Sequence, residues 1–154
     1  MINFRSMAST LILSSMFLSA NFVMAQDSST FLKVESHQSY TGTISALKKA
    51  INSNQMMVMG HIDQAKVLSM TGLQLDGAET FFVGNPQMGK KAFGMDPAAG
   101  AVLPARLYVW SAQGHTFIGY FQPSSQLMAV SPSLAQVGEM LDKKLNMVAS
   151  QAAM

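Results

Sequence analysis

Cysteine is missing from this 154-residue chain. Disulfide bonds, thiolate metal sites and cysteine nucleophiles are therefore excluded. Charge is also scarce, because acidic and basic residues together make up only 12% of the chain and the formal net charge is +2. No run of lysine or arginine is long enough to follow a phosphate backbone. Nucleic acid is therefore not expected as a partner.

The sequence motifs of several enzyme classes are missing as well. There is no Gly-x-Ser-x-Gly sequence and no phosphate-binding glycine loop. His37, His61 and His115 do not have the four-residue spacing of a helical zinc pair. The few carboxylates are not paired by local spacing for acid–base chemistry. These absences favour a non-enzymatic protein without a cofactor, and an enzyme of unknown reaction is the alternative.

The N-terminal segment has the pattern of a cleaved secretory signal. Arg5 provides a positive charge before an apolar stretch that runs from Met7 to Met24. Val23 and Ala25 stand at the positions that a signal peptidase reads. We therefore expect a periplasmic or secreted protein.

The rest of the chain is apolar enough to fold as one domain, since 49% of all residues are hydrophobic. A membrane anchor is the alternative use of the N-terminal segment. It fits less well, because the most apolar part, Leu11 to Leu18, is too short to span a bilayer. We expect a signal peptide at 1–25, a mature domain at 26–154, and no membrane association after the signal is removed.

The mature segment begins with alternating strand and helix patterns. Ile44, Leu47 and Ile51 recur at three- and four-residue spacing, which indicates one apolar face of a helix. Thr41 or Thr43 can cap the start of this helix. The first expected elements are a strand at 31–36, a helix at 40–54, a strand at 56–62, a short helix at 64–70 and a strand at 78–83.

A break at Gly84-Asn85-Pro86 separates this first half from a hairpin and a final helix. Ser131 and Pro132 are typical of a helix start, because serine can cap and proline is tolerated in the first turn. The pattern predicts a single α+β domain with a mixed or largely antiparallel sheet packed by helices, in the order β-α-β-α-β-β-β-α. The later elements are a short helical turn at 87–95, an irregular segment at 96–104, an antiparallel hairpin of strands 106–111 and 116–121, and a C-terminal helix that frays at 150–154.

The segment from Thr41 to Trp110 resembles the domain-of-unknown-function 302 family. The resemblance rests on the order of four features, which are Ile62-Asp63, Ala65, Asn85-Pro86 and Leu103-Pro104. It extends over roughly 31–123, by the order of the elements. Many relatives have a cysteine or a glycine before Asn-Pro, and here that residue is Gly84. The sequence departs from one branch of the family at Gly89-Lys90 and at Val102. The resemblance implies a small α+β domain that is often a homodimer, and it implies no activity.

The break after the third expected strand is the candidate ligand site. Gly84, Asn85 and Pro86 would form the edge of a cleft, with His61 and Asp63 nearby. A rigid turn is the alternative, because proline fixes φ and asparagine can hydrogen-bond its own backbone. Asp63 can instead cap the short helix that follows it, and His61 beside it could carry a proton.

A methionine-rich strand offers a second candidate site. Met57, Met59 and His61 share one face of an ideal strand. Thioether and imidazole ligands suit Cu(I), so these three residues are a candidate copper site. The alternative is that methionine is a flexible filler of the core, as its scatter over the whole chain suggests.

The predicted hairpin carries large rings on both faces. Tyr108 and Trp110 share one face of the first strand, while Phe117 and Tyr120 lie on opposite sides of the second. One face should pack against helices, so the other needs a cover, which is the C-terminal helix, a partner subunit or an apolar ligand. This pattern is the main sequence argument for association, so we expect a homodimer. A small apolar or anionic ligand is a further expected partner.

Overall fold

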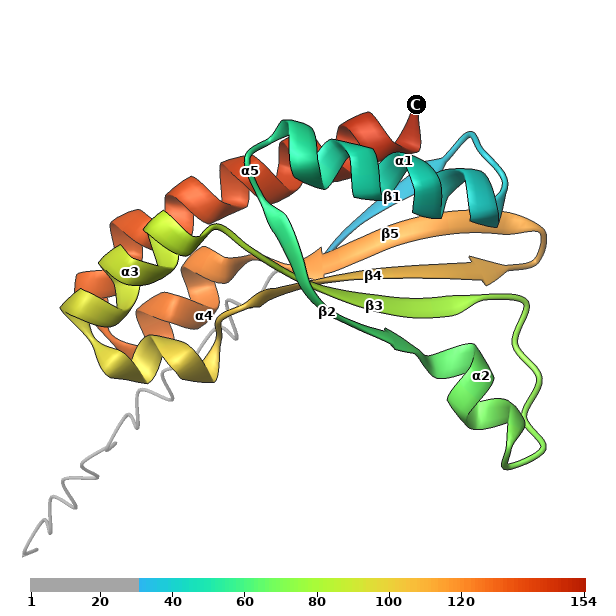
Figure 1. Cartoon of the computed structure of the whole chain (residues 1–154), viewed down its shortest axis with the longest axis horizontal. Helices are drawn as coiled ribbons and strands as arrows, with labels where there is room; N and C mark the ends of the chain where they lie inside the picture. Colours follow the sequence, from blue (N-terminus) through green and yellow to red (C-terminus); the bar gives the residue numbers. More distant parts are fainter. Residues whose placement is uncertain (1–30) are drawn as a thin grey trace, which may run out of the picture.

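A computed structural model describes residues 31–154, which form a five-stranded antiparallel sheet (Figure 1). The strand order is β1-β5-β4-β3-β2, so β1 and β2 are the two edges. All four pairings are antiparallel, so of the two expected sheet types, mixed and largely antiparallel, the antiparallel one is found. The strands are β1 (Phe31–Ser36), β2 (Met57–Asp63), β3 (Ala78–Gly84), β4 (Ala105–Ala112) and β5 (His115–Phe121).

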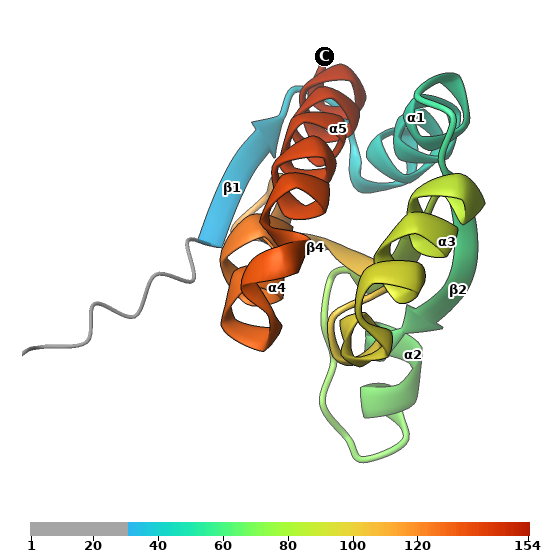
Figure 2. The ribbon, with the colours of Figure 1, turned by 90° about the vertical axis from the view of Figure 1, so that its left-hand side faces the viewer.

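Two long helices cover one face of the sheet. α1 (Tyr40–Ser53) and α5 (Ala135–Ala153) pack against each other, and α4 (Pro123–Val130) packs on α5 (Figure 2). The predicted stripe of α1 is confirmed, because Ile44, Leu47 and Ile51 are buried. Within the part of the chain that the structure describes, no helix has the length and apolarity needed to cross a membrane.

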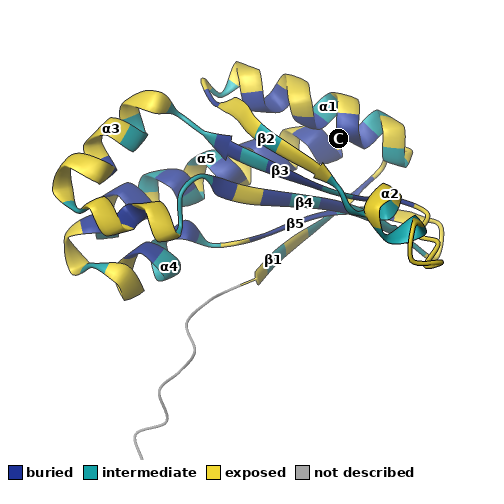
Figure 3. Ribbon diagram, turned by 60° about the horizontal axis from the view of Figure 1, so that its bottom comes forward, coloured by how far each residue is buried: buried dark blue, intermediate teal, exposed yellow. Residues whose placement is uncertain are grey.

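The other face of the sheet is open. Alternate side chains of β4 and β5 point to opposite faces. Leu107, Val109 and Ile118 are fully buried beneath the helices. Tyr108 and Trp110 alternate with these residues and so lie on the opposite face, where they are only partly buried. Figure 3 shows that β4 carries both buried and partly buried positions. The two long helices, α1 and α5, both lie on the other side of β4 in Figure 1. The C-terminal helix, one of the three expected covers, therefore lies on the other side.

The helix boundaries differ from the predicted ones in several places. Residues 87–95 belong to a full helix, α3 (Pro86–Met95), and the segment expected to be irregular contains a 3-10 turn, η1 (Pro97–Ala101). Ser39, and not Thr41 or Thr43, caps α1, since its hydroxyl accepts from the Gly42 N–H. Thr43 is buried and its hydroxyl donates to Ser36.

The C-terminal region also differs from the prediction. Two helices follow the hairpin where one was expected, because α4 ends at Val130 and a 3-10 turn, η2 (Pro132–Leu134), precedes α5. The Ser131 side chain does not cap, since its hydroxyl contacts Ser133. Residues 150–154 were expected to fray, but α5 runs to Ala153, whose carbonyl accepts from the His37 N–H at 2.9 Å. Contacts with the segment after β1 hold this end in place.

Two shorter elements agree with their sequence signals. Asp63 caps α2 (Gln64–Ser69), because its carboxylate accepts from the Lys66 N–H at 2.8 Å. The β4–β5 hairpin turns at Gln113 and Gly114, which both have positive φ angles of 53° and 81°. Two successive residues of this kind suit a two-residue turn between antiparallel strands.

Candidate functional site

A hollow of about 710 Å³ lies on the open face of the sheet. Its floor comes from the middle strands, with Thr80 and Phe82 on β3 and Tyr108 on β4. The segment 100–105, which includes the end of η1 and the residues after it, forms one wall. Phe31, on the edge strand β1, also lies in the lining. Pockets that enclose small molecules have volumes of roughly 300–1,000 Å³, so this hollow is large enough for one.

The register of β3 and β4 determines where the polar groups of the hollow lie. Arg106 pairs with Phe82 across β3 and β4, and Tyr108 pairs with Thr80. The Gln64 side chain, at the start of α2, donates to the Thr80 hydroxyl. The Gln64 Oε1 atom is buried and has no partner among residues 31–154. An unpaired buried polar atom is costly, and such atoms are uncommon in folded proteins.

An aromatic cluster continues from the hollow toward the β1 edge. Tyr108 and Trp110 are stacked with ring centroids 5.2 Å apart, and Trp110 lies 5.3 Å from Phe117. Phe31 covers Gly119, where an added Cβ would lie 2.5 Å from the Phe31 ring. A glycine at this position therefore lets the rings lie close to the sheet. Lys33 extends over Phe117, with its Nζ atom 4.7 Å from the ring centroid.

Gly84, Asn85 and Pro86 border a different and smaller pocket of about 160 Å³. The Asn85 side chain accepts from the N–H groups of Gln87 and Met88 and so caps α3. Its Nδ2 atom donates to the Gln55 carbonyl. The oxygen of the Asn85 amide is thus occupied by the turn itself and the nitrogen by Gln55, which matches the structural alternative that the sequence offered. Ligand binding at these three residues stays a prediction.

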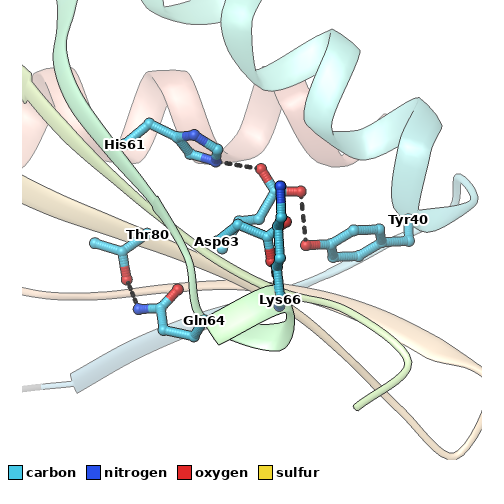
Figure 4. A network of polar contacts seen from close by, with 7 residues as sticks. Tyr40, His61, Asp63, Gln64, Lys66 and Thr80 are labelled. Carbon is cyan, nitrogen blue, oxygen red and sulfur yellow. Dashed lines mark hydrogen bonds and ion pairs between the residues drawn. The ribbon is translucent and has the colours of Figure 1, made fainter. Parts of the chain in front are cut away.

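His61 lies away from this turn, in a polar network on the helix-covered side of β2 and β3 (Figure 4). Its Nε2 atom is 2.5 Å from Glu79 Oε2, and the other oxygen of Glu79 accepts from the Tyr40 hydroxyl at 3.0 Å. Burial raises the pKa of Tyr40, and the hydrogen bond to Glu79 and the charge of Glu79 raise it further. Asp63 is held by its cap, so the structure does not bring His61 and Asp63 together with the Gly84 turn.

The three candidate copper ligands are divided by a bulge. The β2–β3 register shifts between Val58 and Gly60, which breaks the alternation expected of an ideal strand. Met57 and His61 line one hollow of about 440 Å³, whereas Met59 lines the pocket beside Gly84. Within residues 31–154, no three His, Cys, Asp or Glu side chains are grouped to hold a metal. Copper binding by the Met57, Met59 and His61 set stays a prediction.

Sequence reasoning missed Arg106 and the Glu79 network. Arg106, Tyr108 and Trp110 are two residues apart along the predicted strand, so they share one face of it. A charged residue beside two rings on one face could have indicated a binding surface. The pairing of Glu79 with Tyr40 and His61 depends on the strand register and on the docking of α1. That pairing cannot be read from local spacing.

Comparisons with known proteins agree with the fold. The crystal structure of an uncharacterized conserved protein DUF302 from Bacillus stearothermophilus superposes with a TM-score of 0.74 and 22% sequence identity. The match covers 79% of this chain and 97% of the Bacillus chain, and at this identity it supports the fold alone. A comparison with curated proteins found no match. The model of the family "Domain of unknown function DUF302" matches residues 32–152, and the chain therefore belongs to that family.

Proposed function

We propose that this protein is a non-enzymatic binding module that holds a small ligand in the hollow on the open face of its sheet. The observation that carries this proposal is the composition of the hollow. Aromatic rings and a guanidinium that forms no ion pair within residues 31–154 line about 710 Å³ of space beside the central strands of the sheet. A mostly apolar concavity with a few polar groups is typical of small-molecule sites.

The hollow is a better candidate than the pocket beside Gly84, Asn85 and Pro86. That pocket has only about 160 Å³, which is below the usual size of a ligand site. The Asn85 side chain is also fully used by the α3 cap and by Gln55. The Gly84 pocket remains an alternative for a very small apolar group.

Trp110 makes the proposal testable by fluorescence, because it is the only tryptophan of the chain and stacks on Tyr108 in the lining of the hollow. We expect some members of a collection of acidic, basic and neutral aromatic fragments to shift its emission in a saturable way. Phe82→Ala should weaken these ligands, since it removes a ring from the floor. Met128→Ala, on the exposed side of α4, is the matched control and should leave them unchanged. If no fragment gives a saturable shift, the proposal is wrong.

We infer that the module works as a homodimer joined through its β2 edge. β2 leaves one side of its backbone unpaired and carries Met57, Val58 and Met59, which are all exposed and uncharged. The opposite edge strand, β1, carries Lys33 and Glu35, the type of charged residue that keeps sheet edges apart. The exposed, uncharged first three residues of β2 support it as the associating edge.

Secretion completes the proposed function. The support is the signal-like sequence at 1–25, which lies outside the described residues. Mass spectrometry of the protein purified from its native host would give an N-terminus at Gln26 if the signal is removed as expected. An N-terminus at Met1 would contradict this part of the proposal.

A further inference from the structure

The charged groups that line the hollow are of one sign, positive. Among residues 31–154, Arg106 is the only charged side chain that lines it, and no Asp or Glu is present in the lining. The two ion pairs of these residues are His61–Glu79 and His115–Glu35, so Arg106 has no carboxylate partner. The Arg106 side chain is also exposed. A guanidinium in this state is suited to an anion, and a planar carboxylate matches its paired N–H groups best.

A second donor lies next to Arg106. Tyr108 is two residues further along the same face of β4, which places the two Cα atoms about 7 Å apart. Burial raises the pKa of Tyr108, so its phenol stays protonated at neutral pH and can donate a hydrogen bond. The side chains on this part of the floor therefore offer donors to a ligand and no negative charge.

The body of the ligand must match the rings around these donors. Phe82 lies directly across from Arg106 in the strand register. Phe31 and Phe121 line the hollow too, with ring centroids 5.1 Å apart, and both are more than 40% exposed. Exposed flat rings favour a flat apolar partner, because aromatic pairs gain from stacked or tilted contacts beyond the area they bury.

We propose that the hollow binds an aromatic carboxylate, with the carboxylate on Arg106 and the Tyr108 hydroxyl and the ring against Phe82 and Phe121. This inference rests on the proposed function, because it assigns a ligand class to the same hollow. It also explains why an arginine stands on an aromatic sheet face, where a solvated lysine would serve solubility equally well.

Isothermal titration calorimetry with three probes tests the ligand class. 2-Naphthoate carries both a ring system and a carboxylate, 2-naphthamide replaces the carboxylate by a neutral amide, and octanoate replaces the ring by an alkyl chain. We expect 2-naphthoate to bind about tenfold more tightly than the amide, since hydrogen bonds to charged groups are the stronger ones. Octanoate should bind more weakly than 2-naphthoate.

Variants locate the carboxylate. Arg106→Gln should weaken 2-naphthoate by about tenfold or more and leave 2-naphthamide almost unchanged. Lys33→Gln is the matched control, because it removes a positive charge from the same open face but outside the lining of the hollow. Tyr108→Phe keeps the ring and removes the donor, and should weaken 2-naphthoate by about threefold to tenfold.

The outcomes separate this inference from the proposed function. If 2-naphthamide binds as tightly as 2-naphthoate, or if Arg106→Gln has no more effect than Lys33→Gln, the carboxylate assignment is wrong while the ligand site stands. Tighter binding of octanoate would show that the ligand body is aliphatic and would overturn the aromatic assignment. If none of the probes binds and the fragment collection leaves Trp110 unchanged, both proposals fail.

Discussion

Asn85 illustrates how one side chain can account for a turn without a ligand. Its oxygen caps α3 and its nitrogen ties the turn to Gln55. We expect Asn85→Ala to lower the free energy of unfolding by about 1 to 2 kcal/mol, since caps of this type contribute about that much. Asn85→Ser keeps a capping oxygen but is too short to reach the Gln55 carbonyl, so it should cost less. Urea denaturation of both variants checks this, and an equal loss would contradict the capping role.

Tyr40 connects a single residue to the pH dependence of stability. Its folded pKa lies above its ordinary value of 10.0, because of burial first and of Glu79 second. The folded state therefore holds this proton more tightly than the unfolded state. The stabilisation is fully present below pH 10 and is lost as the pH rises through the folded pKa. We expect the free energy of unfolding to fall above pH 10.

Tyr40→Phe tests this assignment, because it keeps the ring beside Gly77 and removes the titrating hydroxyl. At pH 7 the variant should lose about 1.5 to 3 kcal/mol, the contribution of a hydrogen bond to a charged group. The difference from the wild type should shrink when denaturation is measured at pH 11. A difference that is the same at both pH values would show that the hydroxyl does not titrate as inferred.

At the scale of elements, the contact between α4 and α5 depends on a glycine. An added Cβ at Gly138 of α5 would lie 2.4 Å from the Ser124 Cα of α4, which is a backbone atom. Gly138→Ala should therefore lower the free energy of unfolding by about 1 to 3 kcal/mol, although alanine is the better helix former.

Gly89, in the middle of α3, is the matched control for this substitution, since an added Cβ there meets nothing within 4 Å. Gly89→Ala should stabilise the protein by up to about 1 kcal/mol, because only helix propensity changes. Thermal denaturation of the two variants would show shifts of opposite sign. A stabilised Gly138→Ala would contradict the close helix packing.

The elements that sequence predicted well are those with strong local patterns. The first strand was predicted with its observed bounds, and the Asp63 cap was also predicted, because alternation and capping chemistry act over a few residues. The end of α5 was predicted to fray, since its small residues give no local sign of the contact with His37. The hollow was not predicted, because it forms where β3, β4 and η1 meet, and these segments are brought together only by the fold.

At the scale of the whole molecule, the β2 edge predicts the oligomeric state. We expect sedimentation velocity to show a dimer at micromolar concentration. Met59→Lys places a charge on the exposed edge and should give a monomer, as charged residues do on natural sheet edges. Val130→Lys, at the exposed end of α4, is the control and should remain a dimer. A wild-type monomer at tens of micromolar would contradict the proposed assembly.

The open sheet face is the feature on which the proposed function depends. Rings, one guanidinium and a buried amide oxygen with no partner among residues 31–154 meet there, on the side of the sheet opposite to α1 and α5. The most direct test is a map of backbone amide chemical shifts, recorded while 2-naphthoate and neutral fragments are titrated into the labelled protein. We predict saturable shifts concentrated at Thr80, Arg106, Tyr108 and the segment 100–105. Shifts confined to the Gly84-Asn85-Pro86 pocket, or no saturable shifts at all, would contradict the account.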